Sequence, residues 1–161
     1  MAGRFPYRTE AELAPGRFEL VEAFAFAARI DAGEDIHMLS GHDFNRPLAS
    51  RQAGTLAIRE TEDGLEVEAE LRGSTSWRED FLEAHRAGLV RGLSPGFRVP
   101  QGGDVVERRG NGVLRRIVRA ELFEVSTVTR PAFPTAQVEA RSWQTRVQSE
   151  PALHPFARWR F

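Results

Sequence analysis

Short stretches of alternating apolar and polar residues, separated by turn residues, run through most of this 161-residue chain. In the clearest one, Leu65–Leu71, apolar residues at odd positions alternate with glutamates. That alternation predicts a strand with one face on a core and one face in water. The turn sequence Glu62-Asp63-Gly64 separates it from a second apolar stretch, Thr55–Glu60, which predicts a β-hairpin. A chain of this kind has to bury its strands in sheets.

Further strand-like segments follow. Asn111-Gly112 predicts a hairpin between Asp104–Arg109 and Val113–Val118. Leu89–Val99 also reads as a strand, interrupted by glycines and Pro95.

The segment Arg17–Ile30 has two interpretations. Phe18, Leu20, Phe24 and Phe26 share one parity, which favours a strand with one buried face. A helix over Leu20–Ala28 is the alternative, because alanine and glutamate are good helix formers.

One segment has a clear helical signature. Ser76-Trp77-Arg78-Glu79 fits a capping box with Ser76 as N-cap, and apolar residues follow at helical spacing until Gly88. His85 lies on this helix beside apolar residues, so we interpret it as structural. Together with the strands, this predicts a mostly β (α+β) fold, with a small closed β-barrel-like sheet and one or more flanking helices. We expect a folded domain over residues 1–140 and an arginine- and aromatic-rich tail over residues 141–161.

Composition limits the classes of function. Apolar residues make up 41% of the chain, yet no apolar run could span a membrane and no signal peptide is recognisable. The absence of cysteine excludes disulfides and thiolate metal sites, and no histidine–carboxylate cluster has zinc spacing. The net charge of −1 gives no overall field that would favour nucleic acid or an anionic membrane. We therefore expect no metal, no cofactor, no nucleic acid and no membrane.

Glu121–Thr129 carries apolar residues at both parities, which predicts a central strand. Glu124 shares its parity with Leu122, Ser126 and Val128, and a carboxylate on such a face is costly unless it is paired. Glu121 is the competing acidic residue. In a regular strand these two glutamates point to opposite faces, so only one of them could serve a given partner.

Two residues could supply nucleophilic chemistry. Ser94 lies in Gly92-Leu93-Ser94-Pro95-Gly96, where glycines allow close approach of another backbone, although such a sequence is also typical of a turn. His42 follows the apolar segment Ile36–Leu39 and enters a polar bend, a suitable place for a base. A surface histidine capped by Asp43 is the alternative.

Three longer motifs are shared with a known family. They are Met38-Leu39-Ser40-Gly41-His42-Asp43, Gly88-Leu89-Val90-Arg91-Gly92-Leu93-Ser94-Pro95-Gly96-Phe97, and Glu121-Leu122-Phe123-Glu124-Val125-Ser126-Thr127-Val128-Thr129-Arg130-Pro131-Ala132. In these the chain resembles the tailed-phage prohead (capsid maturation) proteases, which are similar to the herpesvirus capsid-assembly serine proteases.

The resemblance implies a herpesvirus-assemblin-like barrel and a serine endopeptidase of phage or phage-like particles, with residues 1–140 as the protease domain. Ser94 would be the nucleophile, His42 the general base, and Glu124 the residue that orients His42, with Glu121 as the fallback. Pro95 departs from the family pattern and has no N–H, so an oxyanion would need another donor, for which the backbone of Arg130 is our candidate.

The same resemblance names partners and a place of action. Substrates would be the major capsid protein, the scaffold protein or scaffolding segment, and the chain itself, inside the assembling prohead in the host-cell cytoplasm. A homodimer is suggested by the herpesvirus relatives, although the sequence shows no self-complementary patch. A non-catalytic capsid assembly factor with the same fold, and an unrelated β-barrel binding module, are the competing hypotheses.

Overall fold

The computed structural model describes residues 1–133 and 137–139. It is mostly β, with 48% strand and 12% helix. The expected tail at residues 141–161 lies outside the described residues. No helix in the described part of the chain is long and apolar enough to cross a membrane.

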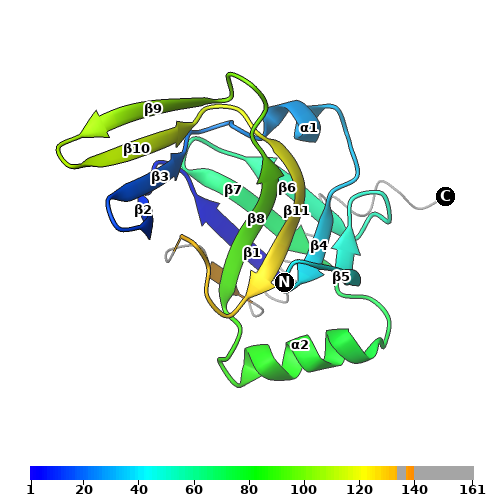
Figure 1. Ribbon diagram of the computed structural model, residues 1–161. Helices are drawn as coiled ribbons and strands as arrows, with labels where there is room; N and C mark the ends of the chain where they lie inside the picture. Colours follow the sequence, from blue (N-terminus) through cyan, green and yellow to red (C-terminus); the bar gives the residue numbers. More distant parts are fainter. Residues whose placement is uncertain (134–136, 140–161) are drawn as a thin grey trace.

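The larger of two sheets has eight strands in the order β5-β4-β11-β8-β12-β1-β7-β6 (Figure 1). Their bounds are β1 Ala2–Pro6, β4 His37–Ser40, β5 Asp43–Ser50, β6 Leu56–Glu60, β7 Gly64–Ala69, β8 Gly92–Arg98, β11 Glu121–Val128 and β12 Gln137–Glu139. The central strand β11 lies parallel to β4 and antiparallel to β8. Leu93, Val125 and Met38 of these three strands are fully buried. These three neighbouring strands therefore pack firmly against the hydrophobic core.

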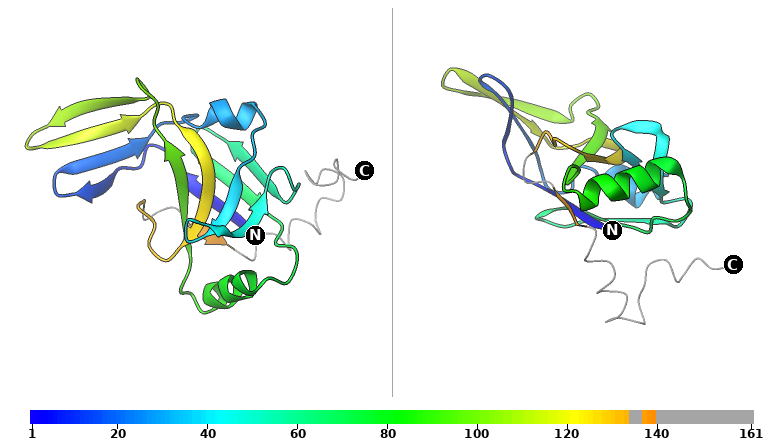
Figure 2. Two further views of the ribbon diagram at one scale, coloured as in Figure 1. Left: turned by 45° about the vertical axis from the view of Figure 1, so that its right-hand side comes forward. Right: turned by 90° about the horizontal axis from the view of Figure 1, so that it is seen from below.

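The smaller sheet has the order β2-β3-β10-β9 and extends from one end of the larger one (Figure 2). Its strands are β2 Ala11–Ala14, β3 Arg17–Val21, β9 Asp104–Arg109 and β10 Gly112–Ile117. Val21 and Ile117, at the ends of β3 and β10, are buried in the common core. The edge strand of this sheet, β9, leaves Val105 and Val106 exposed.

The prediction of a closed barrel is wrong. Among the described residues, β5 and β6 end the larger sheet and do not pair with each other. The β4–β5 ladder has two register shifts, and Pro47 within β5 has no N–H to offer a further strand. These features make β5 an edge, and the sheet stays open.

The two predicted hairpins are confirmed as β6–β7 and β9–β10. The predicted helix is confirmed as α2, Ser76–Arg86, but its N-cap is Thr75 and no side-chain capping bond forms, so the expected capping box is wrong. A single strand over Arg17–Ile30 is also wrong, as is a helix over Leu20–Ala28. The strand β3 ends at Val21, Phe24 takes a positive φ of 61°, and α1 occupies Ala27–Asp31.

Candidate active site

The three sequence motifs meet on one face of the middle of the larger sheet. In the β8–β11 ladder, Ser94 lies opposite Ser126 and Gly96 lies opposite Glu124. Directly opposed residues of an antiparallel pair share a face, and residues two apart on a strand share it too. Ser94, Gly96, Glu124 and Ser126 therefore point to the same side, away from the core residues Leu93 and Val125.

A β-bulge at Phe123 changes the faces that the sequence predicted for β11. The register steps from Leu122–Phe97 directly to Glu124–Gly96, which leaves Phe123 without a partner. Leu122 is fully buried in the core together with Val125, whereas Glu124 faces the site. The expectation that Leu122 and Glu124 share a face is therefore wrong, because it assumed a regular strand.

The same bulge places both candidate glutamates on the site face, since their partners Arg98 and Gly96 are two residues apart on β8. The two carboxylates nevertheless have different partners. Glu121 accepts hydrogen bonds from Nε and Nη2 of Arg98 at 3.0 and 2.6 Å. Glu124 contacts His42 instead.

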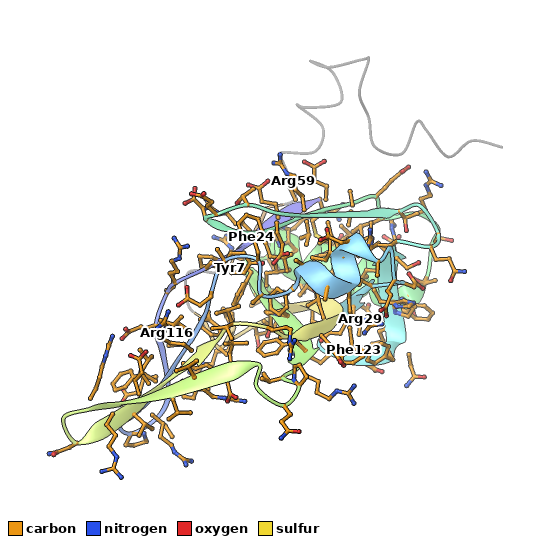
Figure 3. The ribbon with its side chains drawn as sticks, turned by 90° about the horizontal axis from the view of Figure 1, so that it is seen from above. Tyr7, Phe24, Arg29, Arg59, Arg116 and Phe123 are labelled. Carbon is orange, nitrogen blue, oxygen red and sulfur yellow. The ribbon has the colours of Figure 1, made fainter. Side chains whose placement is uncertain are left out.

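Arg29 of α1 contributes a second cation beside the bulge. Its guanidinium carbon lies 4.3 Å from the centre of the Phe123 ring, and Figure 3 shows the two side chains together. The bulged residue is thus held between α1 and Arg98, whose guanidinium lies 5.9 Å away.

His42 stands at the tip of the two-residue β4–β5 turn. Ser40 pairs with Asp43, and the central residues Gly41 and His42 have φ values of 67° and 61°. Two positive φ angles are the signature of a type I′ turn, a conformation that is strained for a residue with a Cβ. The backbone N–H of His42 donates to Ser126 Oγ at 3.0 Å, which ties this turn to β11.

The imidazole of His42 pairs with the Glu124 carboxylate. His42 Nδ1 lies 2.7 Å from Glu124 Oε1, and the side chains are 46% and 6% exposed, respectively. Because a carboxylate only accepts, the geometry fits the tautomer in which Nδ1–H donates to it and Nε2 keeps its lone pair. The pair therefore presents a basic nitrogen on the solvent side of a buried carboxylate.

Ser94 is half-buried on the strand that flanks β11 on its other side. The structure brings it to the same face as His42 and Glu124. Within the described residues, no hydrogen bond joins Ser94 to His42. Hydrogen bonds of catalytic groups are often long before a substrate binds.

Gly96 makes room for the Glu124 carboxylate. A Cβ at position 96 would lie 1.9 Å from Glu124 Oε1 and 2.6 Å from its carboxyl carbon. Only glycine at this position lets the carboxylate pack against β8 while it contacts His42.

Pro95 is compatible with its strand. The carbonyl of Thr127 accepts a hydrogen bond from the N–H of Gly41, so the backbone groups of Thr127 point toward β4. Backbone groups of successive residues in a strand point to alternate neighbours, so those of Val125, two residues earlier, also point toward β4. Val125 is the partner of Pro95, and that pair therefore has no N–H···O bond to lose. By the same alternation the N–H of Ser94 points into the ladder toward Ser126, so it is not free to bind an oxyanion.

Arg130 follows β11, and its neighbour Pro131 packs on the site face. A Cβ at Gly92 would lie 2.6 Å from Pro131 Cδ, which shows that the proline ring covers Gly92, two residues before Ser94. The backbone of Arg130, which is exposed, therefore passes close to the first residues of β8, where Ser94 lies.

The other two histidines in the described part of the chain have partners outside the site. Nδ1 of His85 lies 2.8 Å from the carbonyl oxygen of Val90, and Nε2 of His37 lies 3.5 Å from Asp35. No group of three potential metal ligands occurs within residues 1–133 and 137–139.

A serine on the same face of a sheet as a histidine paired with a buried carboxylate is the set of groups with which serine peptidases carry out acyl transfer. The family model of the caudovirus prohead serine proteases matches residues 5–149, and the chain belongs to this family. The family has a protease role in the maturation of phage capsids. No curated protein and no solved structure matches the chain significantly.

Proposed function

We propose that this chain is a serine endopeptidase in which Ser94 is the nucleophile, His42 the general base and Glu124 the residue that orients His42. The observation that carries the proposal is the 2.7 Å contact between His42 and Glu124, which are 82 residues apart in the sequence, on the face that also bears Ser94. A buried carboxylate, an imidazole with a free Nε2 and a strand serine supply the three parts that the chemistry needs.

The reaction has two halves. Nε2 of His42 takes the proton of Ser94 Oγ while the oxygen attacks the peptide carbonyl carbon, and Glu124 stays ionised and stabilises the imidazolium. The imidazolium then gives this proton to the leaving amine as the C–N bond breaks. Water, deprotonated by His42, attacks the resulting ester, and His42 returns this proton to Ser94 Oγ as the ester C–O bond breaks and the carboxylic acid leaves.

The oxyanion needs a donor other than residues 94 and 95, since the ladder engages the first N–H and proline lacks the second. We assign this role to the backbone N–H of Arg130. The packing of Pro131 on Gly92 supports it, because this contact fixes the Arg130 segment beside Ser94.

The substrates in this proposal are the major capsid protein, the scaffold protein or scaffolding segment, and the chain itself, cut inside the prohead in the host-cell cytoplasm. Within a closed shell the local substrate concentration is high. We therefore expect slow cleavage of the same substrates in dilute solution.

Labelling with diisopropyl fluorophosphate tests the proposal. This reagent phosphorylates an activated serine, so mass spectrometry should locate one adduct on Ser94 in the wild type and none in His42→Ala. An adduct on another serine, or equal labelling of both proteins, would contradict the assignment.

Substitution of Gly96 tests the role of the carboxylate. Gly96→Ala should displace Glu124 from His42, slow Ser94 phosphorylation at least about tenfold, and lower the free energy of unfolding by about 1–3 kcal/mol. The measurements are the labelling rate per folded molecule and thermal unfolding.

Gly64→Ala is the matched control for Gly96→Ala. A Cβ at Gly64 would lie 2.5 Å from the carbonyl oxygen of Phe5, on β7 and outside the candidate site. This variant should lose stability but keep the labelling rate of its folded fraction. Equal labelling rates in both glycine variants would show that Gly96 serves packing alone.

A further inference from the structure

Ser126 is fully buried beside Glu124, and its hydroxyl is engaged on both sides. Its Oγ–H donates to Glu124 Oε2 at 2.5 Å, and its Oγ accepts the backbone N–H of His42 at 3.0 Å. Glu124 Oε1 in turn contacts the imidazole of His42. The three residues therefore form a closed ring of hydrogen bonds in which His42 takes part twice, once through its backbone and once through its ring.

This ring of hydrogen bonds offsets two local energetic costs, the burial of a carboxylate and a strained backbone conformation. The Glu124 carboxylate is almost completely buried, and a buried carboxylate needs donors on both oxygens. The turn that carries His42 holds a residue with a side chain at positive φ, which persists only where neighbouring contacts fix it. The Ser126 hydroxyl supplies a donor to the first group and an acceptor to the second.

We propose that Ser126 is a positioning residue. Its hydroxyl fixes both the orientation of the Glu124 carboxylate and the position of the His42 turn relative to β11. This inference rests on the proposed function, since it concerns how the same site is held. The hydrogen bonds act in series, and each polarises the next. Without the hydroxyl, Glu124 Oε2 and the His42 N–H both lose their partner, and only the ring contact with Glu124 Oε1 still joins His42 to β11 within this ring of hydrogen bonds.

The test compares Ser126→Ala with Ser126→Thr, which keeps a hydroxyl, and with Thr127→Val. Thr127 is the matched control because it is the next residue, is 2% exposed, and donates its hydroxyl to the carbonyl oxygen of Leu39 rather than to the site. Should Ser126→Ala unfold at the assay temperature, Ser126→Cys takes its place, because a thiol fills a similar volume with a weaker donor.

Two readouts separate a positioning role from a structural one. The first is the rate of Ser94 phosphorylation by diisopropyl fluorophosphate, which should fall up to about 100-fold in Ser126→Ala and stay near wild type in Thr127→Val. The second is the ¹⁵N NMR spectrum of the imidazole. The wild type should show a single Nδ1–H tautomer for His42, Ser126→Ala a mixture of tautomers, and Ser126→Thr a return toward the wild-type spectrum.

The outcomes distinguish this inference from the proposed function. A wild type that is not phosphorylated at Ser94 contradicts the proposed function, while the tautomer spectra still decide the role of Ser126. A Ser126→Ala protein with the wild-type labelling rate and a single Nδ1–H tautomer overturns the positioning role. Equal losses in Ser126→Ala and Thr127→Val would also overturn it, because they would reflect the removal of any buried hydroxyl from β11.

Discussion

Replacing Ser94 with alanine is expected to abolish peptide hydrolysis without unfolding the protein. Loss of the nucleophile from an assembled triad lowers kcat by about 10⁶-fold. The Ser94 side chain is half-buried and lies outside the hydrophobic core, so its removal should change the free energy of unfolding by no more than about 1 kcal/mol. The measurements are hydrolysis of p-nitrophenyl acetate, an ester that acylates activated serines whatever the peptide specificity, and thermal unfolding.

Ser74→Ala is the control for this prediction. Ser74 is exposed in the segment before α2, and it belongs to none of the strands β4, β8 and β11 that carry the candidate site. It should hydrolyse the ester at the wild-type rate, whereas Ser94→Ala should fall to the uncatalysed rate. Full turnover by Ser94→Ala would remove this serine from the mechanism.

Glu124→Gln is expected to reduce activity far more than Glu121→Gln. A neutral amide opposite Nδ1 no longer stabilises the imidazolium and can stabilise the wrong tautomer, an effect of about 10⁴-fold in a comparable triad. Glu121 instead pairs with Arg98, whose side chain is 71% exposed, and such pairs contribute little. Glu121→Gln should therefore keep activity within about twofold.

The two glutamine variants are matched in chemistry, strand and face, so their comparison isolates the contact with His42. The measurements are ester hydrolysis and the imidazole ¹⁵N spectrum of each variant. The reverse order of activities would exchange the roles of the two glutamates. Equal small losses would mean that neither carboxylate supports His42.

Local sequence patterns predicted much of the fold. Alternation and turn residues were sufficient for β6–β7 and β9–β10, because these hairpins depend on neighbouring residues. Helical spacing was sufficient for α2, although the helix begins one residue earlier than predicted, with Thr75 rather than Ser76 as N-cap. The short strands β1, β2 and β12 were not predicted, since each is only three to five residues long and depends on partners distant in the sequence.

Closure of the larger sheet could not be predicted from such patterns. It depends on whether the two end strands meet, which is a property of the whole chain. The register shifts of β5 leave no local signal apart from Pro47.

The candidate site was predicted in its members but not in its geometry. Glu124 stood out as a carboxylate among apolar residues, and the structure gives it His42 as a partner. The bulge at Phe123 has no clear sequence signal. The prediction therefore assumed a regular β11 and wrongly placed Leu122 and Glu124 on one face.

The part played by Ser126 was missed for a related reason. Its parity with Glu124 indicated a shared face, but its bond to the His42 backbone depends on the positive φ angles of the turn. The Ser40-Gly41-His42-Asp43 sequence contains one signal for that turn, a glycine at the first central position.

Co-expression with the major capsid protein proposed as the substrate tests the central claim most directly. The wild-type chain and Ser94→Ala would each be produced with that protein, and the intact masses of all chains would be read. We predict new capsid-protein fragments, with sharply defined ends, for the wild type alone. Intact masses in both cultures, with the two proteins still co-purifying, would contradict the protease and identify the chain as a capsid assembly factor that keeps the fold.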